Sequence, residues 1–81
     1  MFDNLKKIQQ LKAVKDSLEK ERVEVEKEGT RVVFNGKMKI EELSLNSSLD
    51  QQNQERVLRE CINEAVDKIQ MIVAKQMMKL Q

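Results

Sequence analysis

A helical pattern of apolar residues in the C-terminal third of the chain is the feature that most limits how it can fold. Apolar side chains recur every three or four residues from Leu58 to Leu80, as they do along the buried face of an α-helix. A helix over residues 51–80 would be about 45 Å long, whereas a compact chain of 81 residues is only about 30 Å across. The chain's own core cannot cover such a stripe, so the sequence predicts a partner for it.

A second copy of the same chain is the simplest partner, because a two-fold axis lets one surface serve both subunits. The chain has one cysteine and two aromatic residues, so neither disulfides nor large rings can make up for a small core. We therefore predict a homodimer. Its interface is expected to contain the apolar residues of the helix's second half, namely Ile69, Ile72, Val73, Met77 and Leu80.

The N-terminal half of the chain predicts another helix followed by two strands. Apolar residues at helical spacing predict a helix over about residues 3–21; they are Leu5, Ile8, Leu11, Val14 and Leu18. The pattern then changes, and Val23 and Val25 alternate with glutamates, which predicts a strand over residues 22–27. The β-branched and aromatic residues that follow predict a second strand over residues 30–35.

Two turns are expected to join the strands. Glu28-Gly29 is one candidate, and Asn35-Gly36 is the other. We predict a two-residue type I′ turn at Asn35-Gly36, because both residues tolerate a positive φ. A third strand over residues 37–45 would follow, with a bulge near Glu41-Glu42 that brings its apolar residues to one face. The polar segment over residues 46–50 holds helix-capping residues and precedes the long helix.

These elements predict an α+β fold in a single domain over residues 1–81: a helix, three antiparallel strands and a long helix. We expect two copies to associate, with the second half of the long helix projecting as an arm. No apolar run approaches the about 20 residues that a membrane span requires, so no membrane partner is expected. A lone cysteine suits a reducing compartment, which favours a cytoplasmic location.

Two acid-free stretches rich in lysine distinguish the ends of the chain from its acidic middle. They cover residues 4–15 and 68–81, although the formal net charge of the chain is only +1. Surface lysines often serve only solubility, but this clustering favours contact with a polyanion. The candidate polyanion-binding residues are Lys6, Lys7, Lys12, Lys15, Lys68, Lys75 and Lys79.

The sequence offers little for catalysis. The chain has no histidine, so Cys61 has no imidazole to activate it and is expected to be a buried structural thiol on the apolar stripe. Gly29 and Gly36 are seven residues apart, which is not the spacing of a phosphate-binding loop. We expect no enzyme activity, no cofactor, no metal ion and no small-molecule substrate.

Five segments, taken in order along the chain, share a pattern with one known family. Met1–Leu5 resembles its Met-Phe-Gly-Asn-Leu opening, and Val23–Glu26 lies where it has a first short strand. Val32–Lys37 resembles its Val-rich strand ending in Asn-Gly, and Leu43–Leu49 resembles its strand end followed by Asp-Pro-Ser-Leu. Cys61–Ala65 resembles its Ala-Val-Asn-Asp-Ala stretch. Together they resemble the YbaB/EbfC family of bacterial nucleoid-associated DNA-binding proteins.

The resemblance implies an intertwined, tweezers-shaped homodimer with helical arms on either side of a shared strand platform. It also implies that the dimer binds double-stranded DNA on the nucleoid and has an architectural or regulatory role. The lysines would contact phosphates, because no segment holds the Arg/Asn/Gln cluster that reads base edges. The chain departs from the family in its shorter first helix, its contracted loop at Glu28-Gly29 and Ser47 in place of proline. The alternative is a scaffold module that holds a partner protein through Met71, Met78 and the basic flank; the low net charge favours it.

Overall fold

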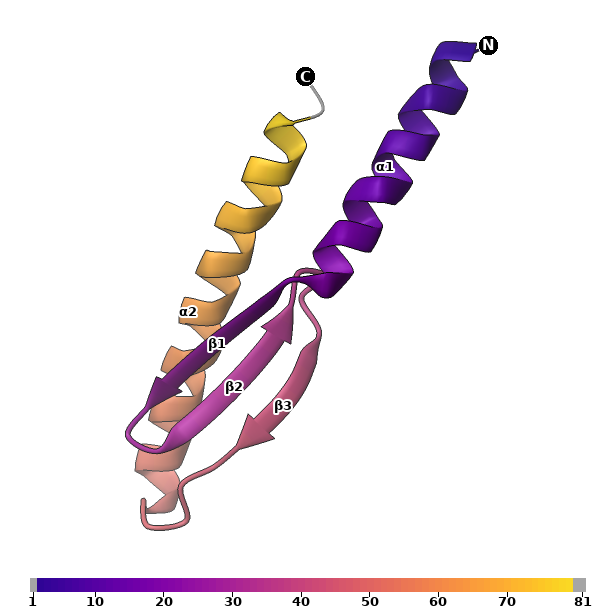
Figure 1. The fold of residues 1–81 in the computed structure, drawn as a ribbon. Helices are drawn as coiled ribbons and strands as arrows, with labels where there is room; N and C mark the ends of the chain where they lie inside the picture. Colours follow the sequence, from indigo (N-terminus) through magenta and orange to yellow (C-terminus); the bar gives the residue numbers. More distant parts are fainter. Residues whose placement is uncertain (1, 80–81) are drawn as a thin grey trace.

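The chain folds as a helix, a three-stranded sheet and a longer helix, which confirms the predicted α+β order (Figure 1). The computed structural model describes residues 2–79, with side chains from residue 5. The elements are α1 (Phe2–Lys20), β1 (Arg22–Lys27), β2 (Thr30–Asn35), β3 (Ile40–Ser44) and α2 (Gln51–Met78). Both helices and the first two strands lie within two residues of the predicted bounds. No helix of residues 2–79 is long and apolar enough to cross a membrane.

The sheet is an antiparallel meander in the order β1-β2-β3, and it contains the predicted bulge. Val33 pairs with Glu42, whereas the next residue of β2, Phe34, pairs with Ile40. Glu41 is therefore the extra residue on β3, within the predicted Glu41-Glu42 pair. The bulge lets apolar residues on both sides of it share one face of the sheet.

The tight turn of the sheet is at Glu28-Gly29, so the type I′ turn predicted at Asn35-Gly36 was misplaced. Glu28 and Gly29 have φ angles of 47° and 81° and connect β1 directly to β2. Two positive φ angles are what a type I′ turn requires, and its twist suits a two-residue hairpin. Glycine removes the steric cost of this conformation at the second position.

A wider loop, organised by Asn35, joins β2 to β3. The Asn35 Oδ1 atom accepts hydrogen bonds from the backbone N–H groups of Lys37 (2.8 Å) and Lys39 (3.3 Å). The Asn35 N–H donates to the Lys39 carbonyl at 2.9 Å, and Met38 takes the left-handed conformation with φ 65°. Residues 36–39 therefore belong to the loop, and β3 begins at Ile40. The predicted start of this strand at residue 37 was wrong.

Gly36 brings this loop against the end of α1. Its N–H donates to the Leu18 carbonyl at 2.9 Å, which satisfies one of the free carbonyls of the last helical turn. A Cβ at position 36 would lie 2.3 Å from that same oxygen. The requirement for glycine is therefore steric, and it arises from the approach of α1 to the loop.

The core lies between α2 and the first two strands. Four α2 residues spaced four apart are fully buried: Val57, Cys61, Ala65 and Ile69. They pack against the buried residues of the facing strands: Val23, Val25, Val32 and Phe34. Cys61 is a buried thiol, as predicted, and burial raises its pKa. The prediction omitted Val57, which is part of this core.

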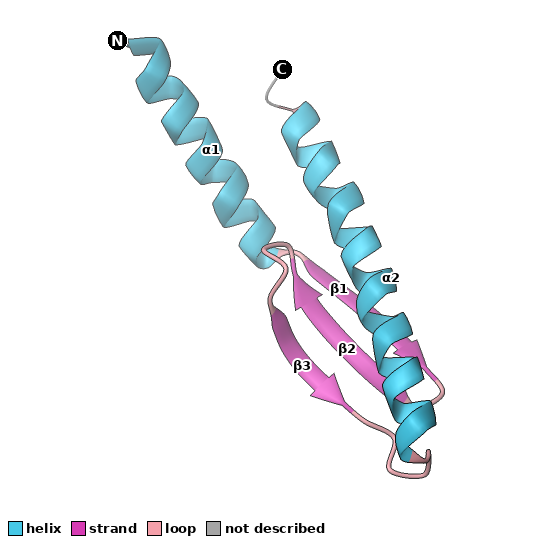
Figure 2. Cartoon of the chain, turned by 180° about the vertical axis from the view of Figure 1, so that it is seen from behind, coloured by secondary structure: helices cyan, strands magenta, loops and turns pink. Residues whose placement is uncertain are grey.

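Both helices extend well beyond the sheet (Figures 1 and 2). The chain measures 58 × 17 × 14 Å and its radius of gyration is 16.4 Å, against about 12 Å for a compact chain of this length. Every side chain from residue 5 to residue 13 of α1 is exposed, and no described residue of α2 beyond Ile69 is buried. The described chain therefore covers only one end of each helix.

We predict that Gly36→Ala destabilises the fold by about 1–3 kcal/mol, the usual cost of overpacking, because its Cβ would collide with the Leu18 carbonyl. Urea denaturation measures the change. Met38→Gly is the matched control in the same loop, and it should not destabilise, because φ 65° favours glycine. A Gly36→Ala protein as stable as the wild type would contradict the contact.

Candidate subunit and nucleic-acid interfaces

The inner face of β3 is apolar and uncovered. α2 packs on β1 and β2 and does not contact β3 within the described residues (Figure 2). The register places Ile40 and Leu43 opposite Phe34 and Val32, which are both buried in the core. Directly opposed residues of antiparallel strands share a face. Even so, Ile40 is 47% exposed and Leu43 51% exposed, and Leu45 just beyond the strand is 49% exposed.

One flank of α2 continues this apolar surface. Intervals of four and seven residues align the flank's side chains, which are Leu58, Ile62, Val66, Val73 and Met77. The first four are half-buried and Met77 is exposed. On the other side of α2, Glu64 pairs with Lys27 of β1 at 3.8 Å, so the apolar flank faces the β3 side.

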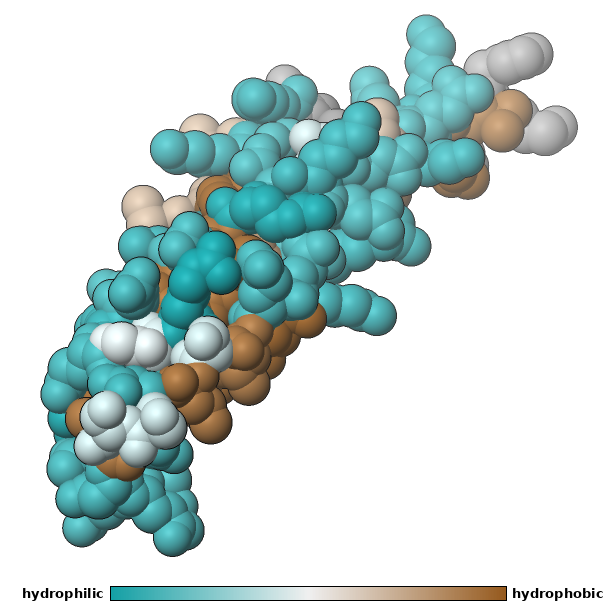
Figure 3. All heavy atoms as spheres, turned by 60° about the horizontal axis from the view of Figure 1, so that its bottom comes forward, coloured by the Kyte–Doolittle hydropathy of each residue, from teal (hydrophilic) through white to brown (hydrophobic). Residues whose placement is uncertain are grey.

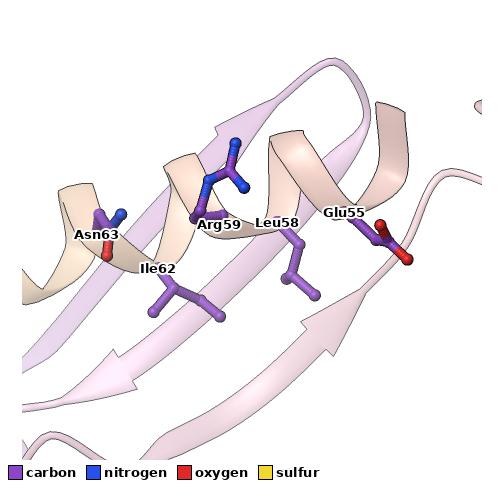
Figure 4. Close-up of a pocket in the computed structure, with 5 residues that line it drawn as sticks. All are labelled: Glu55, Leu58, Arg59, Ile62 and Asn63. Atoms are coloured by element: carbon purple, nitrogen blue, oxygen red, sulfur yellow. The ribbon is translucent and has the colours of Figure 1, made fainter. Parts of the chain in front are cut away.

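Leu58 and Ile62 line an open groove on this flank (Figure 4). Glu55, Arg59 and Asn63 line the groove beside them, so its border carries one acid and one base. Figure 3 shows exposed hydrophobic residues in a patch bordered by hydrophilic ones. We call the inner face of β3 together with this flank of α2 the open apolar surface.

The residues predicted at a dimer interface have different surroundings. Ile69 is fully buried in the chain's own core, so it leaves no surface for a partner to contact. Ile72 and Val73 are half-buried against that core, and Met77 is 46% exposed. Leu80 lies outside the described residues. Val73 and Met77 are therefore the two predicted residues on the open apolar surface.

Ile40, Leu43 and Leu45 were not among the residues predicted at an interface. The predicted bulge already brought the apolar residues of the third strand to one face. The missing information was the position of α2 over the sheet, which leaves that part of the face uncovered.

All seven candidate lysines are exposed, and none forms an ion pair with a carboxylate of residues 5–79. On α2 they share one flank at spacings of seven and four: Lys68, Lys75 and Lys79. On α1 they are spread around the helix, and Lys6 and Lys15 lie on opposite sides at 100° per residue. One straight duplex therefore cannot contact all four α1 lysines of one chain.

The arginines of the sheet are engaged with glutamates. Arg31 donates from Nε to Glu24 at 2.6 Å and lies 3.4 Å from Glu42, while Arg22 pairs with Glu41 at 2.5 Å. The hydrogen bond and charge of Arg31 lower the pKa of the Glu24 carboxyl. On the face of the sheet that carries these arginines, acidic residues outnumber basic ones. This face is therefore a poor surface for DNA.

The structure adds two lysines to the candidate set. Lys37 and Lys39 lie in the β2–β3 loop, and the Lys37 Nζ is 3.0 Å from the Glu19 Oε1 at the end of α1. The hydrogen bond and charge of Lys37 lower the pKa of Glu19, and the charges of Lys15 and Lys39 add to the effect. The Lys37-Met38-Lys39 run was visible in the sequence, but its proximity to α1 depends on the Gly36 contact.

Comparison with models of protein families, with curated proteins and with solved structures found no match to this chain. The resemblance to the YbaB/EbfC family therefore stays a prediction from the motifs.

We predict that Lys37→Gln raises the pKa of Glu19 toward its ordinary value of 4.5, because it removes the largest cause of the lowering. A carboxyl whose pKa is lowered by folding stabilises the fold above its unfolded pKa. That contribution is lost as the pH falls through the folded pKa. NMR titration of the Glu19 carboxyl measures the shift. Lys39→Gln is the control and should cause a smaller rise; an unchanged Glu19 pKa in Lys37→Gln would contradict the ion pair.

Proposed function

We propose that the protein is a homodimer that binds double-stranded DNA mainly through its phosphates, with an architectural or regulatory role on the bacterial nucleoid. The distribution of cations carries this proposal. The helix lysines are exposed and in no ion pair with a described carboxylate, whereas Arg22, Arg31 and Arg56 are paired with glutamates. An unpaired ammonium can bind a phosphate without first breaking an ion pair. We therefore expect the two helices, rather than the sheet, to contact the DNA backbone.

Lysine also indicates the type of recognition. Its ammonium is a point charge on a flexible stem, and it lacks the planar fork with which arginine reads guanine. Contacts of this kind position a protein on the duplex and carry no base information. We therefore expect little sequence preference and a strong dependence of affinity on salt.

The open apolar surface supports the dimer. Apolar areas of this kind on small proteins mark interaction sites, and a two-fold axis can place one copy of the surface against the other. Glu55 and Arg59 on the groove border are oppositely charged. An axis through the groove would let Glu55 of each copy approach Arg59 of the other, so the border is self-complementary in charge.

A dimer would also strengthen DNA binding. Two chains bring two sets of helices to one duplex, and the second set binds at the high effective concentration that the first contact creates. Weak phosphate contacts from each chain would then add up to useful affinity. The low net charge of the single chain is compatible with this arrangement.

A scaffold function is the alternative, and one observation favours it. Met71 and Met78 are 64% and 70% exposed, on the part of α2 that extends beyond the sheet. On α1, Leu5, Ile8 and Leu11 are each more than half exposed. A protein partner could cover these residues, since flexible methionine suits adaptable apolar contacts.

We predict that Leu43→Asp converts a dimer into a monomer, because it places a charge in the open apolar surface, where the two subunits would meet. Sedimentation equilibrium at micromolar concentration gives the mass. Ser44→Asp is the matched control: it adds the same charge at the next residue of β3, on the opposite face, and should remain dimeric. A wild-type protein with the mass of one chain would contradict the homodimer.

We predict that changing Lys68, Lys75 and Lys79 together to Gln flattens the plot of log K against log salt for duplex DNA. Each lost phosphate contact reduces the slope by about 0.9, so the change is up to about three for each chain engaged. Fluorescence anisotropy with a mixed-sequence duplex measures it. Lys27→Gln, which removes a cation paired with Glu64, is the control and should leave the slope unchanged. A wild-type protein that does not bind DNA at low salt would favour the scaffold function.

A further inference from the structure

We propose that Lys37 and Lys39 of the β2–β3 loop, together with Lys15 of α1, form a phosphate-binding site that Glu19 occupies in the free protein. Glu19 would act as a built-in competitor that a backbone phosphate displaces. The identity of the ligand as a DNA phosphate rests on the proposed function above. The site itself lies where the β2–β3 loop meets the end of α1.

Two contacts at this junction bring the lysine-bearing loop against the end of α1. The Gly36 N–H donates to the Leu18 carbonyl at 2.9 Å, so the loop lies against the last turn of α1. The Lys37 Nζ then reaches the Glu19 Oε1 at 3.0 Å. Lys15 precedes Glu19 by one helical turn and therefore lies on the same side of α1.

Hydrogen bonds occupy the backbone of the loop, so it offers no free donor. All four N–H groups of residues 36–39 are used: one donates to Leu18, and the other three donate to Asn35. A ligand can therefore be held only by the lysine ammonium groups. Because Asn35 fixes the backbone that carries Lys37 and Lys39, little backbone order is lost on binding.

Glu19 has the properties expected of a displaceable occupant. Its carboxylate accepts a hydrogen bond from an ammonium group, as a phosphate oxygen would. The Glu19 side chain is 55% exposed, so it can turn into water without moving α1, whereas Lys37 is only 27% exposed. The charges of Lys37, Lys15 and Lys39 all lower the pKa of the Glu19 carboxyl. These four groups together keep a net positive charge, which attracts a second anion.

The competition weakens phosphate binding, because the Glu19–Lys37 pair must open first. Glu19→Gln should therefore tighten duplex binding by up to about fivefold, the range of an exposed ion pair. Lys37→Gln with Lys39→Gln should weaken binding. Glu26→Gln is the matched control: it makes the same change of charge near the far end of β1, where Glu26 has no ion pair with a described residue, and it should have a smaller effect.

The decisive experiment is a double-mutant cycle measured by anisotropy with the full chain. If Glu19 acts through Lys37, Glu19→Gln should tighten binding in the wild type and have little effect in the Lys37→Gln protein. Equal gains in both backgrounds, or a gain equal to that of Glu26→Gln, would overturn the proposal while leaving DNA binding intact.

A titration with inorganic tripolyphosphate, followed by NMR, separates this proposal from the proposed function. Shifts of the amide signals of residues 36–39 that are larger in Glu19→Gln than in the wild type would support the site. This result would stand even if no variant bound DNA, in which case only the DNA function would fail. Amide signals that do not move in either protein would overturn the site.

Discussion

The packing of α2 on two of the three strands is the interaction on which the rest of the structure depends. Val57, Cys61, Ala65 and Ile69 recur every fourth residue and meet the valines of β1 and β2. These four residues form one side of a broad apolar stripe on α2. The other side, the flank that includes Leu58 and Ile62, is only half-buried. The same placement leaves the inner face of β3 without a cover. The packing of α2 on β1 and β2 thus forms the core of the chain and also leaves uncovered the surface that we assign to a second copy.

A second constraint, the approach of Gly36 to the Leu18 carbonyl, determines what lies around the end of α1. α1 has few other contacts, since its side chains from residue 5 to residue 13 are exposed. The glycine contact brings the β2–β3 loop and its lysines to α1, where Glu19 neutralises one of them. A residue that looks like half of a turn motif therefore works as a docking point between two elements.

The charged residues of the sheet and those of the helices have different surroundings. Arginine and glutamate pair on the sheet, where short cross-strand distances suit the fork of the guanidinium group. The exposed lysines of α1 and of the second half of α2 remain in no ion pair with a described carboxylate. A net charge of +1 thus conceals a sheet rich in glutamate, a basic α1 and a basic second half of α2, and this separation favours α1 and the second half of α2 as the DNA-binding elements.

Both helices, β1, β2 and the bulge at Glu41 were predictable from the sequence, because apolar periodicity and strand propensity depend on residues that are close together along the chain. The sequence also placed Cys61 in the core. It misplaced the type I′ turn, since Asn35 and Gly36 suit a tight hairpin locally but are used by a loop that docks on α1. It could not assign Val57 or Ile69 to the chain's own core. Which edge of the α2 stripe is buried depends on where the helix lies over the sheet. That position is a property of the folded chain, and the periodicity of the sequence carries no information about it.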